Sequence, residues 1–178
     1  MTQASNQKPL NVLFLGGRNA VRSIMAEAIL NREGMGRYQA FSAGREPSGK
    51  VHPATLDLLS KLSFDVSQLR SKSWLDFVGP DAIPLDFVFT VCDGVADAAC
   101  AWPGNPETGH WGLPDPAAVQ GKEPETRVAF ADTFRMLNHR IVIFTSLPIR
   151  SLDQSSLRRQ LDLIARRNDS LKREAAAA

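Results

Sequence analysis

The sequence predicts an α/β fold in which helices cover a small, mostly parallel sheet. Short apolar runs alternate along the chain with segments of helical periodicity. The first strand, helix and strand together have the length of one right-handed crossover unit. The chain has 178 residues, the size of one ordinary domain. In a sheet of this kind, ligands bind beyond the carboxyl ends of the strands.

Three strands are predicted from apolar and β-branched runs. Residues 10–15 are almost continuously apolar and end at a glycine pair, which is typical of a buried parallel strand. Residues 38–43 form a second run, also closed by a glycine, and residues 85–91 form a third that is rich in aromatic and β-branched side chains. A long loop follows, and we expect a brief fourth strand in it near His110.

Helices are predicted between and after these strands. Residues 23–30 are good helix formers, and Pro53 stands at a first-turn position where a helix needs no amide donor. A short helix is expected at residues 73–77, and two longer helices fill the final third. Their apolar positions recur every three or four residues, at Phe130, Phe134, Leu137, Ile141 and Phe144, and then at Leu157, Leu161 and Ile164.

The composition narrows the classes of function. Lys plus Arg number 21 and Asp plus Glu 19, so the net charge is +2, too small to indicate nucleic acid or an anionic membrane as the main partner. No apolar run approaches the roughly 20 residues of a membrane span, and the polar start lacks a signal-peptide core. We therefore expect a cytoplasmic protein. Two cysteines cannot build a disulfide scaffold.

The chain is expected to form one domain with short tails. Residues 1–9 are interpreted as a flexible leader, residues 10–167 as the domain, and residues 168–178 as a fraying helix end or tail. The three histidines have no ligand spacing with the cysteines, so no metal site is predicted, and no cofactor is implied.

The loop after the first strand, Gly16 to Ser23, is the candidate anion site. A glycine-containing turn between a strand and a helix start directs several backbone amides at one point, and the helix dipole adds positive charge there. Arg22 at the helix start can donate two parallel hydrogen bonds to a tetrahedral oxyanion, and Arg18 offers a second cation. The alternative interpretation is a tight turn with solvated arginines.

This segment resembles the phosphate loop of the low-molecular-weight protein tyrosine phosphatase family, and most of all the thioredoxin-coupled arsenate reductases of that fold. Their pattern is a nucleophilic Cys, five residues and then Arg-Ser, directly after the first strand. Arg22 and Ser23 match the end of the pattern, and Asn19 matches its structural asparagine. Further matches run in order between about residues 11 and 165: Ser42–Gly44, Val51–Pro53, Arg70–Trp74, Asp86–Asp93, Cys100–Gly104 and His110–Ala117. The resemblance implies a three-layer sandwich with a four-stranded parallel sheet.

The sequence departs from this family at the nucleophile. Counted back from Arg22, the position of the nucleophilic cysteine is Gly16, which has no side chain to attack phosphorus or arsenic. Arg18 stands where the family has a glycine, and Ala20 where it has a small polar residue. The resemblance thus implies an amide cradle without its thiolate. The expected oxyanion-binding residues are Gly17, Arg18, Asn19, Ala20, Val21, Arg22 and Ser23.

The resemblance also assigns roles to two cysteines and one acid. Cys92 and Cys100 stand where the arsenate reductases relay oxidation and then meet thioredoxin, although free cysteines are more often small buried apolar residues. Asp115 stands at the general-acid position, where a carboxyl protonates the leaving oxygen of a phosphate monoester.

Three functions follow in order of preference. The first is a pseudoenzyme that binds phosphate, arsenate or a phosphorylated ligand at residues 16–23. The second is an active arsenate reductase that uses Cys92 and Cys100 with thioredoxin. The third is a non-catalytic protein-interaction module in which the old site is only scaffold.

Overall fold

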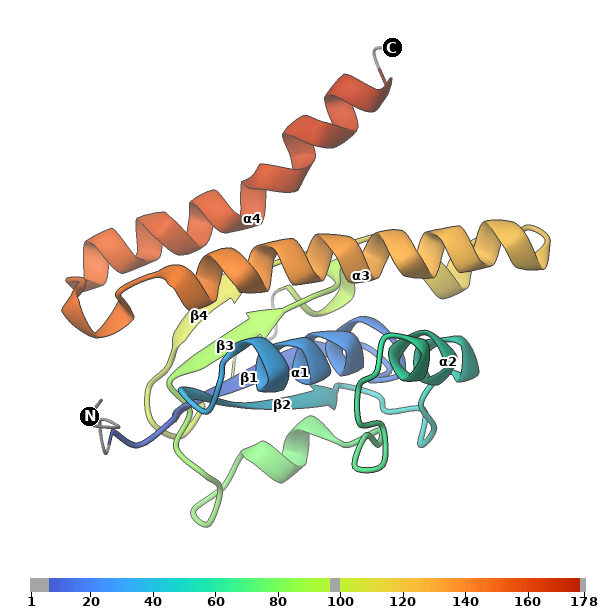
Figure 1. Cartoon of the computed structure of the whole chain (residues 1–178). Coiled ribbons are helices and arrows are strands. Elements are labelled where there is room, and N and C mark those ends of the chain that lie inside the picture. The colour runs from blue at the N-terminus through green and yellow to red at the C-terminus, as the bar shows by residue number, and fades with distance from the viewer. Residues whose placement is uncertain (1–6, 97–99, 177–178) are drawn as a thin grey trace, which may run out of the picture.

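The computed structural model describes residues 7–96 and 100–176 of the chain (Figure 1). Its centre is a four-stranded sheet in the order β2-β1-β3-β4, with every pairing parallel. The predicted α/β class with a four-stranded parallel sheet is confirmed. The strands are β1 (Leu10–Gly16), β2 (Tyr38–Gly44), β3 (Phe87–Thr90) and β4 (Glu107–His110).

Four α-helices pack against one face of this sheet (Figure 1). The opposite face is covered more thinly, by loops and by short 3-10 helices at Trp74–Phe77 and Asp93–Val95. The third layer of the sandwich therefore contains no long helix among the described residues. The α-helices are α1 (Arg22–Glu33), α2 (Pro53–Lys61), α3 (Glu123–Ser146) and α4 (Gln154–Ala176).

β1 is continuously apolar because both of its faces are buried. Val12 and Phe14 belong to the large core cluster shared with the helices. Leu13 and Leu15 point the other way, into a smaller cluster beneath the 3-10 helix Trp74–Phe77. A strand fixed on both faces places its carboxyl end, Gly16, firmly in the middle of the sheet.

Aromatic rings hold β3 against the helical layer. Phe89 stacks on Trp111 with 4.0 Å between ring centroids, and the edge of Phe144 from α3 meets both rings. The buried guanidinium of Arg140 on α3 donates to the carbonyls of Trp111, at 2.7 Å, and Ala165, at 3.0 Å. These contacts tie α3, α4 and the segment after β4 together.

The sequence misplaced some element ends. β3 spans Phe87–Thr90, shorter than the predicted 85–91. Backbone hydrogen bonds to β1 continue one residue beyond each end, from the Asp86 amide to the Asn11 carbonyl at 2.8 Å and from the Val91 amide to the Leu15 carbonyl at 3.0 Å. The brief fourth strand expected near His110 is β4, which ends at that residue. Residues 141–144 lie in α3, as the helical period predicts.

The proposed domain limits stay predictions. Most of the leader, residues 1–6, lies outside the described residues. α4 continues past residue 167 to Ala176.

In the described part of the chain, no helix combines the length and the apolar character needed to cross a membrane.

Phe89→Ala should destabilise the fold by about 3–5 kcal/mol, because it removes a buried ring and leaves a cavity beside Trp111. Urea unfolding followed by circular dichroism measures the change. Val128→Ala, at a side chain that is 59% exposed on α3, is the control and should stay within about 0.5 kcal/mol. Equal losses in the two variants would contradict this account of the core.

Candidate active site

A cleft of about 570 Å³ lies at the carboxyl end of β1. The predicted loop, Gly16 to Ser23, forms one wall, and Asp115 lies on another. The structure thus brings together the loop and the acid that the sequence singled out. The remaining lining residues are Ser48, Lys50, Val51, His52, Pro53, Ala117 and Ala118.

The carbonyl groups of the loop are bonded to neighbouring segments. The Gly16 carbonyl accepts from the Arg45 amide at 3.1 Å, and the Gly17 carbonyl accepts from the Glu46 amide at 2.9 Å. The Arg18 and Ala20 carbonyls are likewise taken, by amides of residues 48 and 52 at 2.9 Å each. The amides of residues 18–21, in contrast, have no hydrogen-bond partner within the part of the chain that the structure describes.

Free amides at a helix start attract anions, because each amide carries partial positive charge and the α1 dipole adds to it. The loop wall of the cleft therefore has the chemistry of an anion cradle.

Asn19 fixes the bend of the loop. Its φ is 47°, a left-handed conformation that asparagine tolerates better than most residues. The buried side chain donates to Ser23 Oγ at 2.9 Å and accepts from the Lys72 amide at 2.7 Å. The loop also lies close against the end of β2, where a Cβ on Gly44 would come within 2.8 Å of the Gly17 carbonyl oxygen. Only a glycine at position 44 permits this approach.

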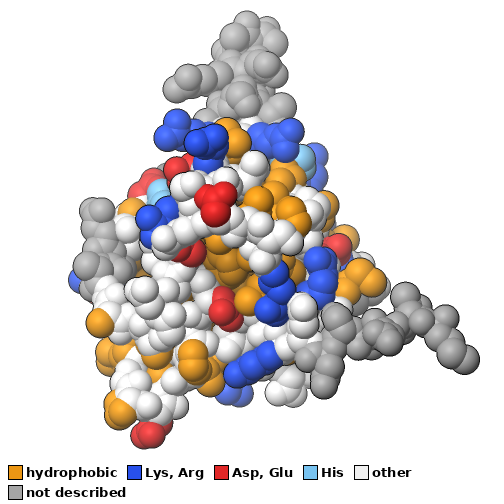
Figure 2. All heavy atoms as spheres, turned by 90° about the vertical axis from the view of Figure 1, so that its left-hand side faces the viewer, with side chains coloured by type: hydrophobic (Ala, Val, Ile, Leu, Met, Phe, Trp, Pro, Cys, Tyr) orange, Lys and Arg blue, Asp and Glu red, His pale blue; other side chains and the backbone are white. Residues whose placement is uncertain are grey.

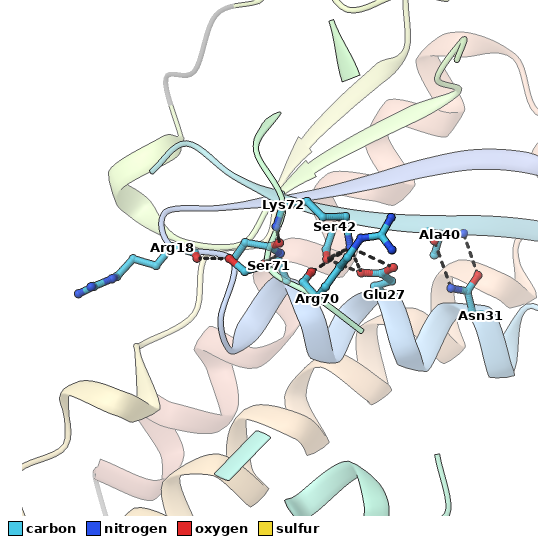
Figure 3. Close-up of polar contacts among 10 residues, drawn as sticks. Arg18, Glu27, Asn31, Ala40, Ser42, Arg70, Ser71 and Lys72 are labelled. Carbon is cyan, nitrogen blue, oxygen red and sulfur yellow. Dashed lines mark hydrogen bonds and ion pairs between the residues drawn. The ribbon is translucent and has the colours of Figure 1, made fainter. Parts of the chain in front are cut away.

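Lys72, whose amide binds Asn19, forms a half-buried ion pair with Glu27 (Figure 3). Lys72 Nζ lies 3.1 Å from Glu27 on α1, and it also donates to the Arg70 carbonyl at 3.1 Å. The hydroxyl of Ser42 on β2 donates to the same Glu27 carboxylate. The Arg18 carbonyl accepts from Ser71 Oγ at 3.2 Å, while in Figure 3 the Arg18 side chain points away from this network.

Arg22 connects the loop to the opposite wall. Its guanidinium donates to the Leu113 carbonyl at 2.7 Å and lies 3.4 Å from the Asp115 carboxylate. Asp115 in turn accepts from the Ala117 amide at 3.1 Å, which caps the short 3-10 helix that follows. A bound anion would meet Arg22 already held at the cleft, with an acid beside it.

A side chain at Gly16 would require Ser23 to give way. The Gly16 backbone is not in the left-handed region, but a Cβ there would lie 3.1 Å from Ser23 Oγ, so this hydroxyl, which accepts from Asn19, must move by a few tenths of an ångström. Nothing in the backbone at this position demands glycine.

The two cysteines lie on the same face of the sheet. Cys92 is buried in the smaller core cluster, and its Sγ would be 3.9 Å from a Cβ built on Gly17. Cys100 lines a separate cavity of about 580 Å³ beside Val88 and Thr90. Both thiols are free. Cys92 thus lies behind the loop, as expected for the end of a neighbouring strand.

The sequence did not predict the contacts by which Lys72 holds Asn19 and pairs with Glu27. Arg70–Trp74 matched the family pattern, but no spacing in the sequence indicates that Lys72 reaches Glu27 and Ser42, because these residues lie on three different elements. Among the described residues, no group of three or more His, Cys, Asp or Glu side chains is placed to hold a metal ion.

Comparison with known proteins agrees with this geometry. The family model for low molecular weight phosphotyrosine protein phosphatase matches residues 11–160. The chain belongs to this family. The match includes the sheet except for Leu10, the loop at the cleft and α1 to α3, so the predicted resemblance is confirmed at the level of the family.

Curated relatives of this phosphatase-family chain are arsenate reductases. That of Halalkalibacterium halodurans is 31% identical over 134 residues, which cover 75% of this chain and 93% of the relative. That of Bacillus subtilis is 31% identical over 115 residues, covering 64% and 79%.

Solved structures show the same fold. The thioredoxin-dependent arsenate reductase of Corynebacterium glutamicum gives a TM-score of 0.58 at 26% identity over 76% of this chain and 60% of its own. The chain thus spans less than two thirds of that protein's length. An arsenate reductase in the phosphate binding state gives a TM-score of 0.53 at 25% identity, covering 74% and 96%.

Lys72→Met should destabilise the protein by about 3 kcal/mol, because it leaves the Glu27 carboxylate half-buried without its cation. Lys61→Met removes an exposed pair with Asp57 on α2 and should cost about 0.5 kcal/mol or less. Urea unfolding compares the two variants. Similar values for both would refute the supporting role of Lys72.

Proposed function

We propose that this chain binds tetrahedral oxyanions at residues 16–23 and is a pseudoenzyme. The ligand is phosphate, arsenate or the phosphoryl group of a larger molecule. The observation that carries the proposal is the set of unpartnered amides at residues 18–21 beside the Arg22 guanidinium. Backbone amides at a helix start and an arginine fork are the donors that a phosphate group prefers.

The missing nucleophile supports binding without turnover. Family catalysis divides one displacement into two steps through a thiol ester, and Gly16 offers no atom to form it. Without a thiolate, the cradle contains one negative charge less. Its amides and the helix dipole then act on the ligand, and Arg22 is shared between the ligand and Asp115, which favours retention of an anion.

The walls of the cleft favour a compact ligand. Val51, Pro53, Ala117 and Ala118 are small or aliphatic, and among the described residues no Phe, Tyr or Trp lines the cleft. The imidazole of His52 is the aromatic ring that these lining residues offer to an aryl phosphate. Inorganic oxyanions and aliphatic phosphate esters fit these walls better.

Titration calorimetry with phosphate and with arsenate tests the binding. Arg22→Gln should weaken both affinities by roughly 10- to 100-fold, because charge-assisted hydrogen bonds are lost. Arg127→Gln, at an exposed position on α3, is the matched control and should bind as the parent does. No binding by the parent, or equal binding by Arg22→Gln, would refute the proposal and favour an interaction module.

Gly16→Cys tests whether only the thiol is missing. It should raise hydrolysis of a phosphate ester by roughly 10³-fold or more over the parent, because the cradle can then lower the pKa of a thiol at its centre. Gly16→Ser fills the same space without a thiol and should stay inactive. An inactive Gly16→Cys that binds phosphate would show that the site has lost more than one sulfur atom.

A second function, arsenate reduction, is supported by the position of Cys92 behind Gly17. The Cys92 thiolate would attack arsenate(V) and release water. The Cys100 thiolate would then attack Cys92 Sγ, so that a disulfide forms and two electrons pass to arsenic, which leaves as arsenite(III). A dithiol reductant of the thioredoxin class would restore both thiols.

Mass spectrometry of alkylated protein after arsenate treatment separates the two functions. The pseudoenzyme proposal predicts that both thiols remain alkylated, as in the untreated protein. A Cys92–Cys100 disulfide that Cys92→Ser abolishes would establish the reductase instead.

A further inference from the structure

A second cleft, of about 420 Å³, lies at the opposite end of the sheet from the oxyanion loop. It lies where β2 starts, between the turn after α1 and the connection from α3 to α4. Figure 2 views the molecule from this end, where Lys and Arg side chains lie beside hydrophobic ones. The lining residues are Gln7, Leu10, Met35, Gly36, Arg37, Tyr38 and residues 147–151.

Tyr38 supplies a polar group to this cleft. The residue is 6% exposed, and its ring packs 5.3 Å from the ring of Phe144. Its hydroxyl has no hydrogen-bond partner within residues 7–96 and 100–176 and is not fully buried, so a ligand in the cleft can reach it. Burial raises the pKa of Tyr38, and the positive charges of Arg37 and Arg150 only partly oppose this. The hydroxyl is therefore a protonated donor at neutral pH.

Two arginines flank this hydroxyl. Arg37 donates to the Thr145 carbonyl at 3.0 Å, and its guanidinium carbon lies 5.5 Å from the Tyr38 ring centroid. Arg150 donates to the Lys8 carbonyl at 2.7 Å. Each guanidinium is thus anchored by one backbone contact, and its other N–H groups remain available. Among the described residues, neither arginine has a carboxylate partner.

The rest of the cleft is apolar. Leu10, Leu147 and Ile149 are half-buried in its wall, and Met35 is 84% exposed at its rim. Residues 1–6, which precede the cleft in the chain, contain no Asp or Glu. Their side chains therefore offer no anion to the two arginines.

We propose that this cleft binds a small organic anion. Its acidic group, a carboxylate or a phosphate, contacts Arg37, Arg150 and the Tyr38 hydroxyl, and its compact apolar body lies against Leu10, Leu147 and Met35. Two exposed guanidinium forks match the oxygens of either acidic group, and the half-buried apolar wall contacts the body of the ligand. This proposal is independent of the function of the loop at residues 16–23.

The chain contains one tyrosine, so an NMR signal from labelled tyrosine reports on Tyr38 alone. Protein labelled with a heavy isotope at tyrosine Cζ gives a single tyrosine NMR signal. Benzoate and phenyl phosphate are titrated separately, to distinguish the carboxylate from the phosphate. At least one should shift the signal saturably. In the double variant R37Q/R150Q, the affinity should fall by roughly 10-fold or more.

Three further variants keep the outcome decisive. Arg135→Gln, at another exposed arginine on α3, should bind as the parent does. Arg22→Gln should also leave the Tyr38 shift unchanged, which separates this cleft from the oxyanion loop. If the double variant does not fold, as judged by circular dichroism, Arg150→Gln alone replaces it, because among the described residues this exposed side chain loses only its hydrogen bond to the Lys8 carbonyl.

No saturable shift with either probe would overturn the proposal. So would an undiminished shift in the folded arginine variants, or a shift abolished by Arg22→Gln alone.

Discussion

The carbonyl groups of Gly16, Gly17, Arg18 and Ala20 are all held by hydrogen bonds from outside the loop, and the rest of the site depends on this constraint. A peptide plane has its carbonyl and amide on opposite sides. Fixing the carbonyls toward the neighbouring segments therefore leaves amides free at the cleft. The anion chemistry of the site is a property of the backbone, so it survives changes in side chains such as those at positions 16, 18 and 20.

The fold supplies each part of this constraint. β1 is buried on both faces and cannot shift, so Gly16 stays at the middle of the sheet. β2 ends beside it in a glycine, which lets the loop approach the strand end. Asn19 then joins the loop to Lys72, whose ammonium is paired with Glu27 on α1. The loop is thus fixed to the sheet and to the helix that follows it, and it needs no ligand to hold its shape.

The sequence predicted the fold class, the apolar faces of the helices and the loop at the carboxyl end of β1. These features depend on local signals, namely the spacing of apolar residues and the glycine pair that follows the first strand. The bounds of β3 were less well predicted, since the run of apolar and β-branched residues extends past both ends of the strand. The contacts of Lys72 and the cleft around Tyr38 could not be predicted, because each joins residues that are far apart in the chain. The resemblance to the family correctly paired Arg22 with Asp115 in one cleft, a contact across 93 positions that no periodicity contains.

Under the proposed function, Gly16 separates the fold of this family from its chemistry. The curated relatives are arsenate reductases and the chain shares their family and fold, but our proposal is that Gly16 leaves the loop without the thiol that would begin the reaction. In this account, a loop built to stabilise a thiolate and a transition state retains an anion instead.

A structure from crystals of the protein grown with tungstate tests this account most directly, because anomalous scattering shows where the tungsten atom binds. The account predicts a tungsten peak in the cleft, with its oxygens on the amides of residues 18–21 and on Arg22. An empty loop at saturating tungstate, or carbonyls of residues 16–20 turned into the cleft, would contradict it.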